Sequence, residues 1–204
     1  MADRPVKLAI IFYSSTGTIY EMARTAQQAG EAAGAEVRLV RARELAPAEA
    51  VASNEAWQAN VDRLQADGVA EATPDDIEWA DAVLFGTPTR YGAVAAQLKQ
   101  YIDGLGPLWQ RGALADKAYA GFTSSSTAHG GQESTLLTLY NNVIHFGGII
   151  VPPGYTHPSK FVDGNPYGAS HVAGQGDHPV DDVTRQAVRH ETERLIQVAG
   201  KLIG

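Results

Sequence analysis

Apolar residues along this chain fall into two kinds of pattern. Short, nearly continuous runs of Val, Ile, Leu and Ala are typical of strands that are buried on both faces of a parallel sheet. Longer segments with apolar residues at every third or fourth position are typical of amphipathic helices. The runs predict strands at residues 7–13, 36–40, 82–86, 117–123 and 148–151. The helical pattern predicts helices at residues 19–33, 93–103, 132–145 and 181–203.

Strands that alternate with helices predict an α/β fold. We expect a doubly wound sheet of five parallel strands in the order 2-1-3-4-5, with helices on both faces and a single domain over residues 1–204. Residues 43–79 are rich in Ala with scattered charges and are predicted to form helix and loop. Residues 152–179 are rich in Gly, Pro, His and Asn, which predicts a surface loop, either ordered or disordered.

The composition of the chain limits which partners, cofactors and metals it can be expected to bind. The net charge of −7 without a long Lys/Arg run argues against nucleic acid and anionic membranes as partners. The absence of cysteine excludes disulfides and thiolate chemistry, so any redox reaction needs a bound cofactor. No metal is assigned, because His157, His171 and His178 match no metal-binding spacing. Residues 1–5 show no signal-peptide core and no segment is apolar enough to be inserted in a membrane, so we expect a cytoplasmic protein.

The loop after the first predicted strand is the most informative part of the chain. It consists of Ser14, Ser15, Thr16, Gly17, Thr18 and Ile19. The loop leads directly into a helix, whose first N–H groups lack partners and lie at the positive end of the helix dipole. Because the loop has neither the lysine of a Walker motif nor the glycine spacing of a dinucleotide motif, it predicts a site for a terminal monophosphate. The alternative is an ordinary helix cap without a ligand.

Two further loops follow the third and fourth predicted strands. The first contains Pro88, Thr89, Arg90, Tyr91 and Gly92. It can place backbone N–H groups and an aromatic ring against a flat isoalloxazine, with the Arg90 charge favouring negative charge on a reduced ring. The second contains Ser124, Ser125, Ser126, Thr127, Ala128, His129 and Gly130, which can donate to the pyrimidine edge of a flavin. Taken singly, each loop is also typical of an ordinary surface turn.

The expected strand order makes these three loops neighbours. In doubly wound sheets the carboxyl ends of the strands meet at one edge, and ligands bind there near the point where the strand order reverses. The sequence therefore predicts one site built from all three loops.

Together, these motifs resemble the WrbA family of NAD(P)H:quinone oxidoreductases, which has a flavodoxin-like fold. The resemblance covers nearly the whole chain. It rests on Tyr13-Ser14 with Gly17, the string Gly86-Thr87-Pro88-Thr89-Arg90-Tyr91-Gly92, Gly130-Gly131-Gln132-Glu133, Val151-Pro152 with Gly154-Tyr155, and Pro166-Tyr167-Gly168-Ala169.

The resemblance implies an FMN cofactor with its phosphate on residues 14–19 and its isoalloxazine against Thr89, Arg90 and Tyr91. Further flavin contacts are implied from residues 124–129. By the same resemblance His145 is the flavin-site histidine and a catalytic candidate together with Arg90. Trp109 is implied to line the substrate pocket across a subunit boundary in a homotetramer, a dimer of dimers. Without the resemblance, His145 would be an ordinary helix-end residue and Trp109 a core aromatic.

The implied activity is the two-electron reduction of quinones to hydroquinones by NADH or NADPH, through ping-pong hydride transfer in one shared pocket. Three features depart from the family pattern. Thr16 stands where members often carry an aromatic residue that touches the nicotinamide, Ser126 replaces a glycine, and residues 51–77 form a longer segment than is typical. The main alternative function is a flavodoxin-type one-electron carrier, and others are a reductase of free flavin or azo compounds and an interaction protein without a cofactor.

Overall fold

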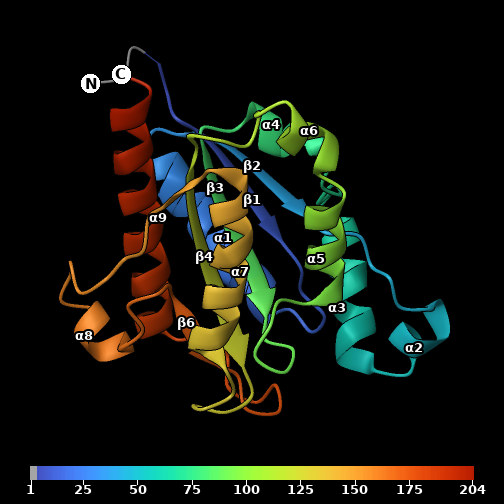
Figure 1. Ribbon diagram of the computed structural model, residues 1–204. Coiled ribbons are helices and arrows are strands. Elements are labelled where there is room, and N and C mark those ends of the chain that lie inside the picture. Colours follow the sequence, from blue (N-terminus) through green and yellow to red (C-terminus); the bar gives the residue numbers. More distant parts are fainter. Residues whose placement is uncertain (1–3) are drawn as a thin grey trace.

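The computed structural model describes residues 4–204 and contains a parallel sheet covered by helices on both faces (Figure 1). Residues 1–3 lie outside the described range. They belong to the N-terminal segment in which the sequence shows no signal-peptide core. The strand order β2-β1-β3-β4-β5 confirms the predicted topology. These five strands are β1 (Lys7–Phe12), β2 (Glu36–Arg41), β3 (Ala82–Pro88), β4 (Ala118–Ser125) and β5 (Ile149–Ile150), and a sixth strand pairs with β4.

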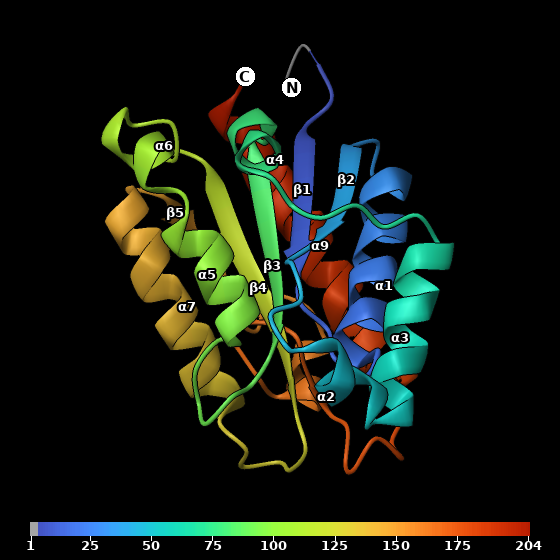
Figure 2. The ribbon, with the colours of Figure 1, turned by 90° about the vertical axis from the view of Figure 1, so that its right-hand side faces the viewer.

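Alternate residues of each central strand point to opposite faces of the sheet. Because helices cover both faces, the residues on both sides are buried, and the strands are therefore continuous apolar runs in the sequence. Leu8, Ile10 and Phe12 of β1 pack in one buried cluster with α1 (Thr18–Ala32) and α9 (Asp182–Leu202). Ala9 and Ile11 belong to a second cluster. That cluster includes residues of α4 (Pro74–Trp79), α5 (Ala96–Asp103), α6 (Gly106–Gln110) and α7 (Gln132–Phe146). Figure 2 shows the two helical layers on opposite sides of the sheet.

One helix begins later than predicted, and one short helix was not predicted. The helix expected to begin at residue 93 begins at Ala96, because Arg90 and Ala93 exchange backbone hydrogen bonds of 2.9 and 3.1 Å that close a turn. The short helix α6 was not predicted. The weakly patterned segment 43–79 forms α2 (Ala48–Ala52), α3 (Glu55–Ala66) and α4, as helix and loop.

The segment 152–179 is more regular than a surface loop. It contains α8 (Lys160–Asp163) and the strand β6 (Ser170–Val172), which pairs in parallel with Thr123–Ser125 at the end of β4. The predicted strand 148–151 is paired only over the two residues of β5, since Pro152 and Pro153 follow and cannot donate to a ladder. The outer edge of β4 is therefore shared between β5 at its start and β6 at its end.

A buried polar cluster anchors this segment to α9. The Lys160 ammonium and the Asp163 carboxylate form an ion pair with side chains that are 0% and 2% exposed. Glu191 of α9 accepts a hydrogen bond of 2.9 Å from the Ala169 N–H, and its second oxygen is buried without a partner among the described residues. Burial raises the pKa of Glu191 to about 8, so this carboxyl is mostly neutral at pH 7.

The Glu191 carboxyl is expected to make the protein less stable as pH rises. Between its ordinary pKa of 4.5 and its folded pKa of about 8, the native state holds a proton that the unfolded state has lost, so the free energy of unfolding falls. Glu191→Gln should remove up to about 1.4 kcal/mol of this loss per pH unit. Urea unfolding from about pH 5 to about pH 8 measures the slope. Glu193→Gln, at an exposed position on the same helix, is the control, and equal slopes for wild type and both variants would contradict the assignment.

Between Arg4 and Gly204, no helix has the length and apolar character needed to cross a membrane.

Candidate functional site

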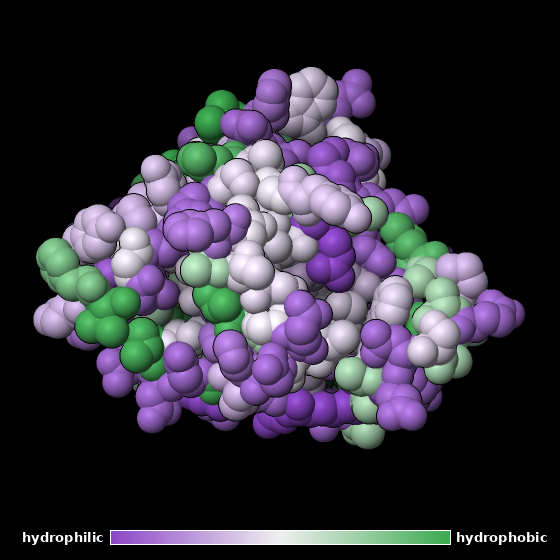
Figure 3. Space-filling view, turned by 90° about the horizontal axis from the view of Figure 1, so that it is seen from below, coloured by the Kyte–Doolittle hydropathy of each residue, from purple (hydrophilic) through white to green (hydrophobic). Residues whose placement is uncertain are grey.

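The three loops singled out in the sequence surround one pocket of about 390 Å³ at the carboxyl end of the sheet. A pocket of this volume is within the range of small-molecule sites. The predicted residues that line it are Ser14, Ser15, Thr16, Thr18, Ile19, Pro88, Thr89, Arg90, Ser124, Ser125 and Ser126. Figure 3 views the molecule from this end, where hydrophilic and neutral residues cover most of the centre. The predicted convergence of the loops is thus present.

The first loop combines a helix cap with a set of free donors. The Ser14 hydroxyl oxygen accepts from the N–H groups of Gly17 (3.2 Å) and Tyr20 (3.3 Å), so it satisfies one of the first N–H groups of α1. Within residues 4–204, the N–H groups of Ser15, Thr16, Thr18 and Ile19 have no acceptor. Gly17 has a φ of 103°, a conformation that favours glycine. The ordinary capping role is therefore real but leaves four donors for a ligand.

The second and third loops brace each other through Thr89. Its N–H donates to the Ser124 carbonyl (2.8 Å), and its hydroxyl donates to the Gly130 carbonyl (3.3 Å). The same hydroxyl oxygen accepts from the Gly92 N–H (3.2 Å) and from the Thr135 hydroxyl (2.8 Å). The Thr89 side chain is thus occupied within the protein, and its contribution to the pocket is mainly the shape of the two loops.

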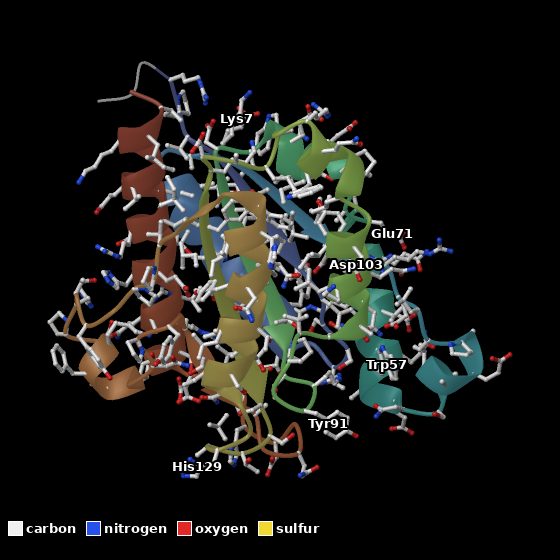
Figure 4. The ribbon with its side chains drawn as sticks, in the orientation of Figure 1. Lys7, Trp57, Glu71, Tyr91, Asp103 and His129 are labelled. Carbon is white, nitrogen blue, oxygen red and sulfur yellow. The ribbon has the colours of Figure 1, made fainter. Side chains whose placement is uncertain are left out.

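The Arg90 side chain connects the first and second loops. Its guanidinium donates to the Ser15 hydroxyl (3.2 Å) and lies exposed at the pocket wall. Tyr91 is fully exposed, with a φ of 54°. Figure 4 shows Tyr91 and His129 projecting from loops at this same end of the molecule. The predicted residues that lie in the three loops without lining the pocket are Gly17, Tyr91, Gly92, Thr127, Ala128, His129 and Gly130.

His145 and Trp109 do not join this pocket within one chain. His145 lies near the C-terminal end of α7, about 20 Å along the helix from the end that faces the pocket. The Trp109 indole N–H donates to the His145 carbonyl (2.8 Å), and both residues line a separate hollow of about 230 Å³. The prediction that His145 contacts the cofactor is therefore not met by the chain's own pocket.

Comparison with known proteins identifies the family. Residues 6–162 match the family model described as NADPH-dependent FMN reductase. The chain belongs to this family. It is 48% identical over 201 residues to a protein of Deinococcus radiodurans named NAD(P)H dehydrogenase (quinone), covering 98% of both chains. It is 39% identical to a protein of the same name from Methanosarcina barkeri, covering 98% of this chain and 100% of the other.

Solved structures agree on the fold of this FMN reductase family member. A flavodoxin, WrbA-like protein from Agrobacterium tumefaciens superimposes with a TM-score of 0.66 at 21% identity, covering 96% of this chain and 98% of the other. The apo form of the NADH:FMN oxidoreductase EmoB gives a TM-score of 0.60 at 16% identity, covering 95% and 89%. At these identities the similarity supports the flavodoxin-like fold alone.

Part of the pocket wall was not predicted from the sequence. Asn54 and Ala56, at the start of α3, line the pocket. Ala173, Gly174, Gln175 and Gly176 line it from the turn after β6. The Ala-Gly-Gln-Gly string was a visible signal inside the Gly-rich segment, but it becomes relevant only when β6 brings it to the end of β4. The start of α3 gave no signal of its own.

One carboxylate organises the border between the pocket and α3. Glu44 Oε2 accepts from the Tyr13 hydroxyl (2.9 Å) and the Trp57 indole N–H (3.0 Å). Glu44 Oε1 accepts from the Gln97 amide (2.9 Å) and from the Ala46 N–H (3.0 Å). Burial acts to raise the pKa of Glu44, but these hydrogen bonds together outweigh it and lower the pKa. Glu44 therefore stays ionised and ties β1, α3 and α5 together.

Proposed function

We propose that this protein is an FMN-dependent NAD(P)H:quinone oxidoreductase that reduces quinones to hydroquinones by two electrons. The observation that carries the proposal is that Ser15, Thr16, Thr18 and Ile19 line a pocket and have N–H groups without an acceptor among the described residues. The chain that holds this loop belongs to the FMN reductase family. The names of relatives that match over the whole chain support the choice of quinone as acceptor. We further propose a cytoplasmic location.

The residues present fit FMN. The free N–H groups and hydroxyls of residues 14–19 suit a phosphate dianion at a helix N-terminus. Thr89, Arg90 and Tyr91 would hold the isoalloxazine, and residues 124–129 would meet its pyrimidine edge. When bound, FMN supplies the hydride chemistry between NADH or NADPH and the quinone. The Arg90 guanidinium, exposed at the pocket wall, would stabilise negative charge that develops there.

We propose that Trp109 and His145 act in the pocket of a neighbouring copy, in a homotetramer. The separation of both residues from the pocket of their own chain and the 56% exposure of Trp109 support this placement. Leu137 and Ile144 add exposed apolar side chains on α7, 47% and 64% exposed.

Trp109→Ala is expected to raise the KM for benzoquinone several-fold and to leave FMN affinity unchanged. The reason is that Trp109 would contact the acceptor across the subunit boundary without touching the phosphate loop. Steady-state kinetics and FMN titration of the variant measure the two effects, with light scattering to verify the oligomer. An unchanged KM in an intact oligomer would contradict the placement.

The function is tested by steady-state oxidation of NADH and NADPH by the FMN-loaded protein, with benzoquinone and both substrates varied. Parallel double-reciprocal lines are expected, because one pocket would serve both substrates in turn. FMN binding without turnover would favour the one-electron carrier. Turnover that requires added free FMN as acceptor would favour a flavin reductase.

A further inference from the structure

Helix α3 contacts the phosphate loop from behind through one buried amide. Asn60 lies in the middle of α3 and is 4% exposed. Its Nδ2 donates to the backbone carbonyl of Ser14 (2.9 Å) and to that of Ser15 (3.1 Å). Segment 51–77 was noted in the sequence as longer than is typical of the family. Through Asn60 it contacts the loop at two consecutive carbonyl groups.

These two hydrogen bonds determine which way the loop directs its donors. Across a trans peptide bond, the carbonyl of one residue and the N–H of the next point in opposite directions. Holding the carbonyls of Ser14 and Ser15 toward Asn60 turns the N–H groups of Ser15 and Thr16 away from it. Ser15 and Thr16 line the pocket, and within the described chain both N–H groups lack an acceptor. The amide thus orients two of the free donors.

The side-chain oxygen of Asn60 accepts no hydrogen bond from the described residues. This Oδ1 is buried without a partner among residues 4–204 and lies 3.4 Å from where a Cβ on Gly17 would stand. A buried unpaired acceptor costs stability. The Asn60 side chain therefore donates two hydrogen bonds to the loop, while its oxygen accepts none. A buried amide with a purely structural role would be expected to satisfy its oxygen as well.

The position of α3 relative to the loop is itself fixed. Trp57, one turn before Asn60, donates to the same Glu44 oxygen as Tyr13, which directly precedes Ser14. This shared carboxylate holds the start of α3 beside the end of β1. The Asn60 amide consequently meets the loop at a defined place.

We propose that Asn60 is a positioning residue for phosphate recognition: by clamping the carbonyls of Ser14 and Ser15, it aims the loop's N–H groups at a terminal phosphate monoester. The inference rests on the proposed FMN site and assigns a role to the segment 51–77. It also implies a specific effect, because only the part of the ligand that meets the loop depends on Asn60.

The experiment compares FMN with riboflavin, which lacks the phosphate. Dissociation constants of both flavins for the apoprotein are measured by fluorescence quenching for wild type, Asn60→Leu and Asn60→Ser. Asn60→Ser removes both hydrogen bonds, because the shorter serine side chain does not reach the carbonyls, and it places no apolar side chain against them. Both variants should bind FMN about 10-fold more weakly, the effect of losing one to two hydrogen bonds, and riboflavin within about twofold of wild type. Gln65→Leu, at an exposed position on α3, is the matched control and should change neither constant.

Two results would overturn the proposal. Equal weakening of FMN and riboflavin in both variants would mean that Asn60 only stabilises the fold, and unchanged FMN binding would mean that the clamp is unnecessary. A wild-type protein that binds riboflavin as tightly as FMN would overturn the phosphate site itself, together with this proposal. The wild-type comparison therefore separates failure of the site from failure of the clamp.

Discussion

Gly168→Ala is expected to destabilise the protein by about 3 kcal/mol or more. A Cβ on Gly168 would lie 2.0 Å from the backbone carbonyl oxygen of Gly121 in β4, a contact that only a backbone shift can relieve. The same Cβ would lie 3.0 Å from Leu136 and 3.2 Å from the buried oxygen of Glu191. Since Gly168 precedes β6, the shift should also move the pocket wall at residues 173–176.

Urea unfolding of the apoprotein measures the loss in stability, and FMN titration measures the effect on the pocket. Gly106→Ala is the control, because a Cβ there meets nothing within 4 Å and its backbone conformation is open to alanine. This control should be neutral or stabilising by up to about 1 kcal/mol. A Gly168→Ala protein as stable as the control would show that β6 does not pack against β4 as described.

Ser14→Ala is expected to weaken FMN binding by roughly 10- to 100-fold, the effect of losing a hydrogen bond to a charged group and its supporting geometry. The change removes the acceptor for the N–H groups of Gly17 and Tyr20 as well as a hydroxyl donor at the pocket. Ser14 is 6% exposed, so water cannot readily replace the lost acceptor. Riboflavin binding should change much less, because the loop meets the phosphate.

Titration of the apoprotein with FMN checks this expectation. Ser53→Ala is the matched control, because its exposed hydroxyl donates to the Ala50 carbonyl (2.8 Å) and lies outside the pocket. The control should keep wild-type affinity for both flavins. If Ser14→Ala binds FMN as tightly as Ser53→Ala, the loop at residues 14–19 does not hold the phosphate.

Much of the fold could be predicted from local patterns. The central strands are buried on both faces, so runs such as Leu8–Phe12 stand out as continuous apolar segments, and their alternation with helices leaves few topologies. The strand β6 could not be predicted this way. Ser170-His171-Val172 is short and largely polar, and it pairs with the end of β4, beyond the two residues of β5. That pairing depends on the tertiary structure.

The candidate site could be predicted where it consists of loops at strand ends, since topology alone makes those loops neighbours. Asn60 could not be predicted, because its contact with Ser14 spans 46 residues and a helix without a distinctive pattern. His145 and Trp109 could not be placed from their residue types. Only the family resemblance implied a role for them at the flavin and the substrate. In the structure His145 lies at the end of α7 that is far from the pocket, and Trp109 of α6 lies beside it.

The most direct test of the central claim follows both half-reactions on one sample. FMN-loaded protein is mixed anaerobically with NADPH or NADH, separated from the nicotinamide, and then mixed with benzoquinone. We expect the flavin absorbance to be lost in the first step and to recover in the second, with one hydroquinone formed per bound flavin. Bound FMN whose absorbance neither nucleotide changes would contradict the account and leave a one-electron carrier in its place.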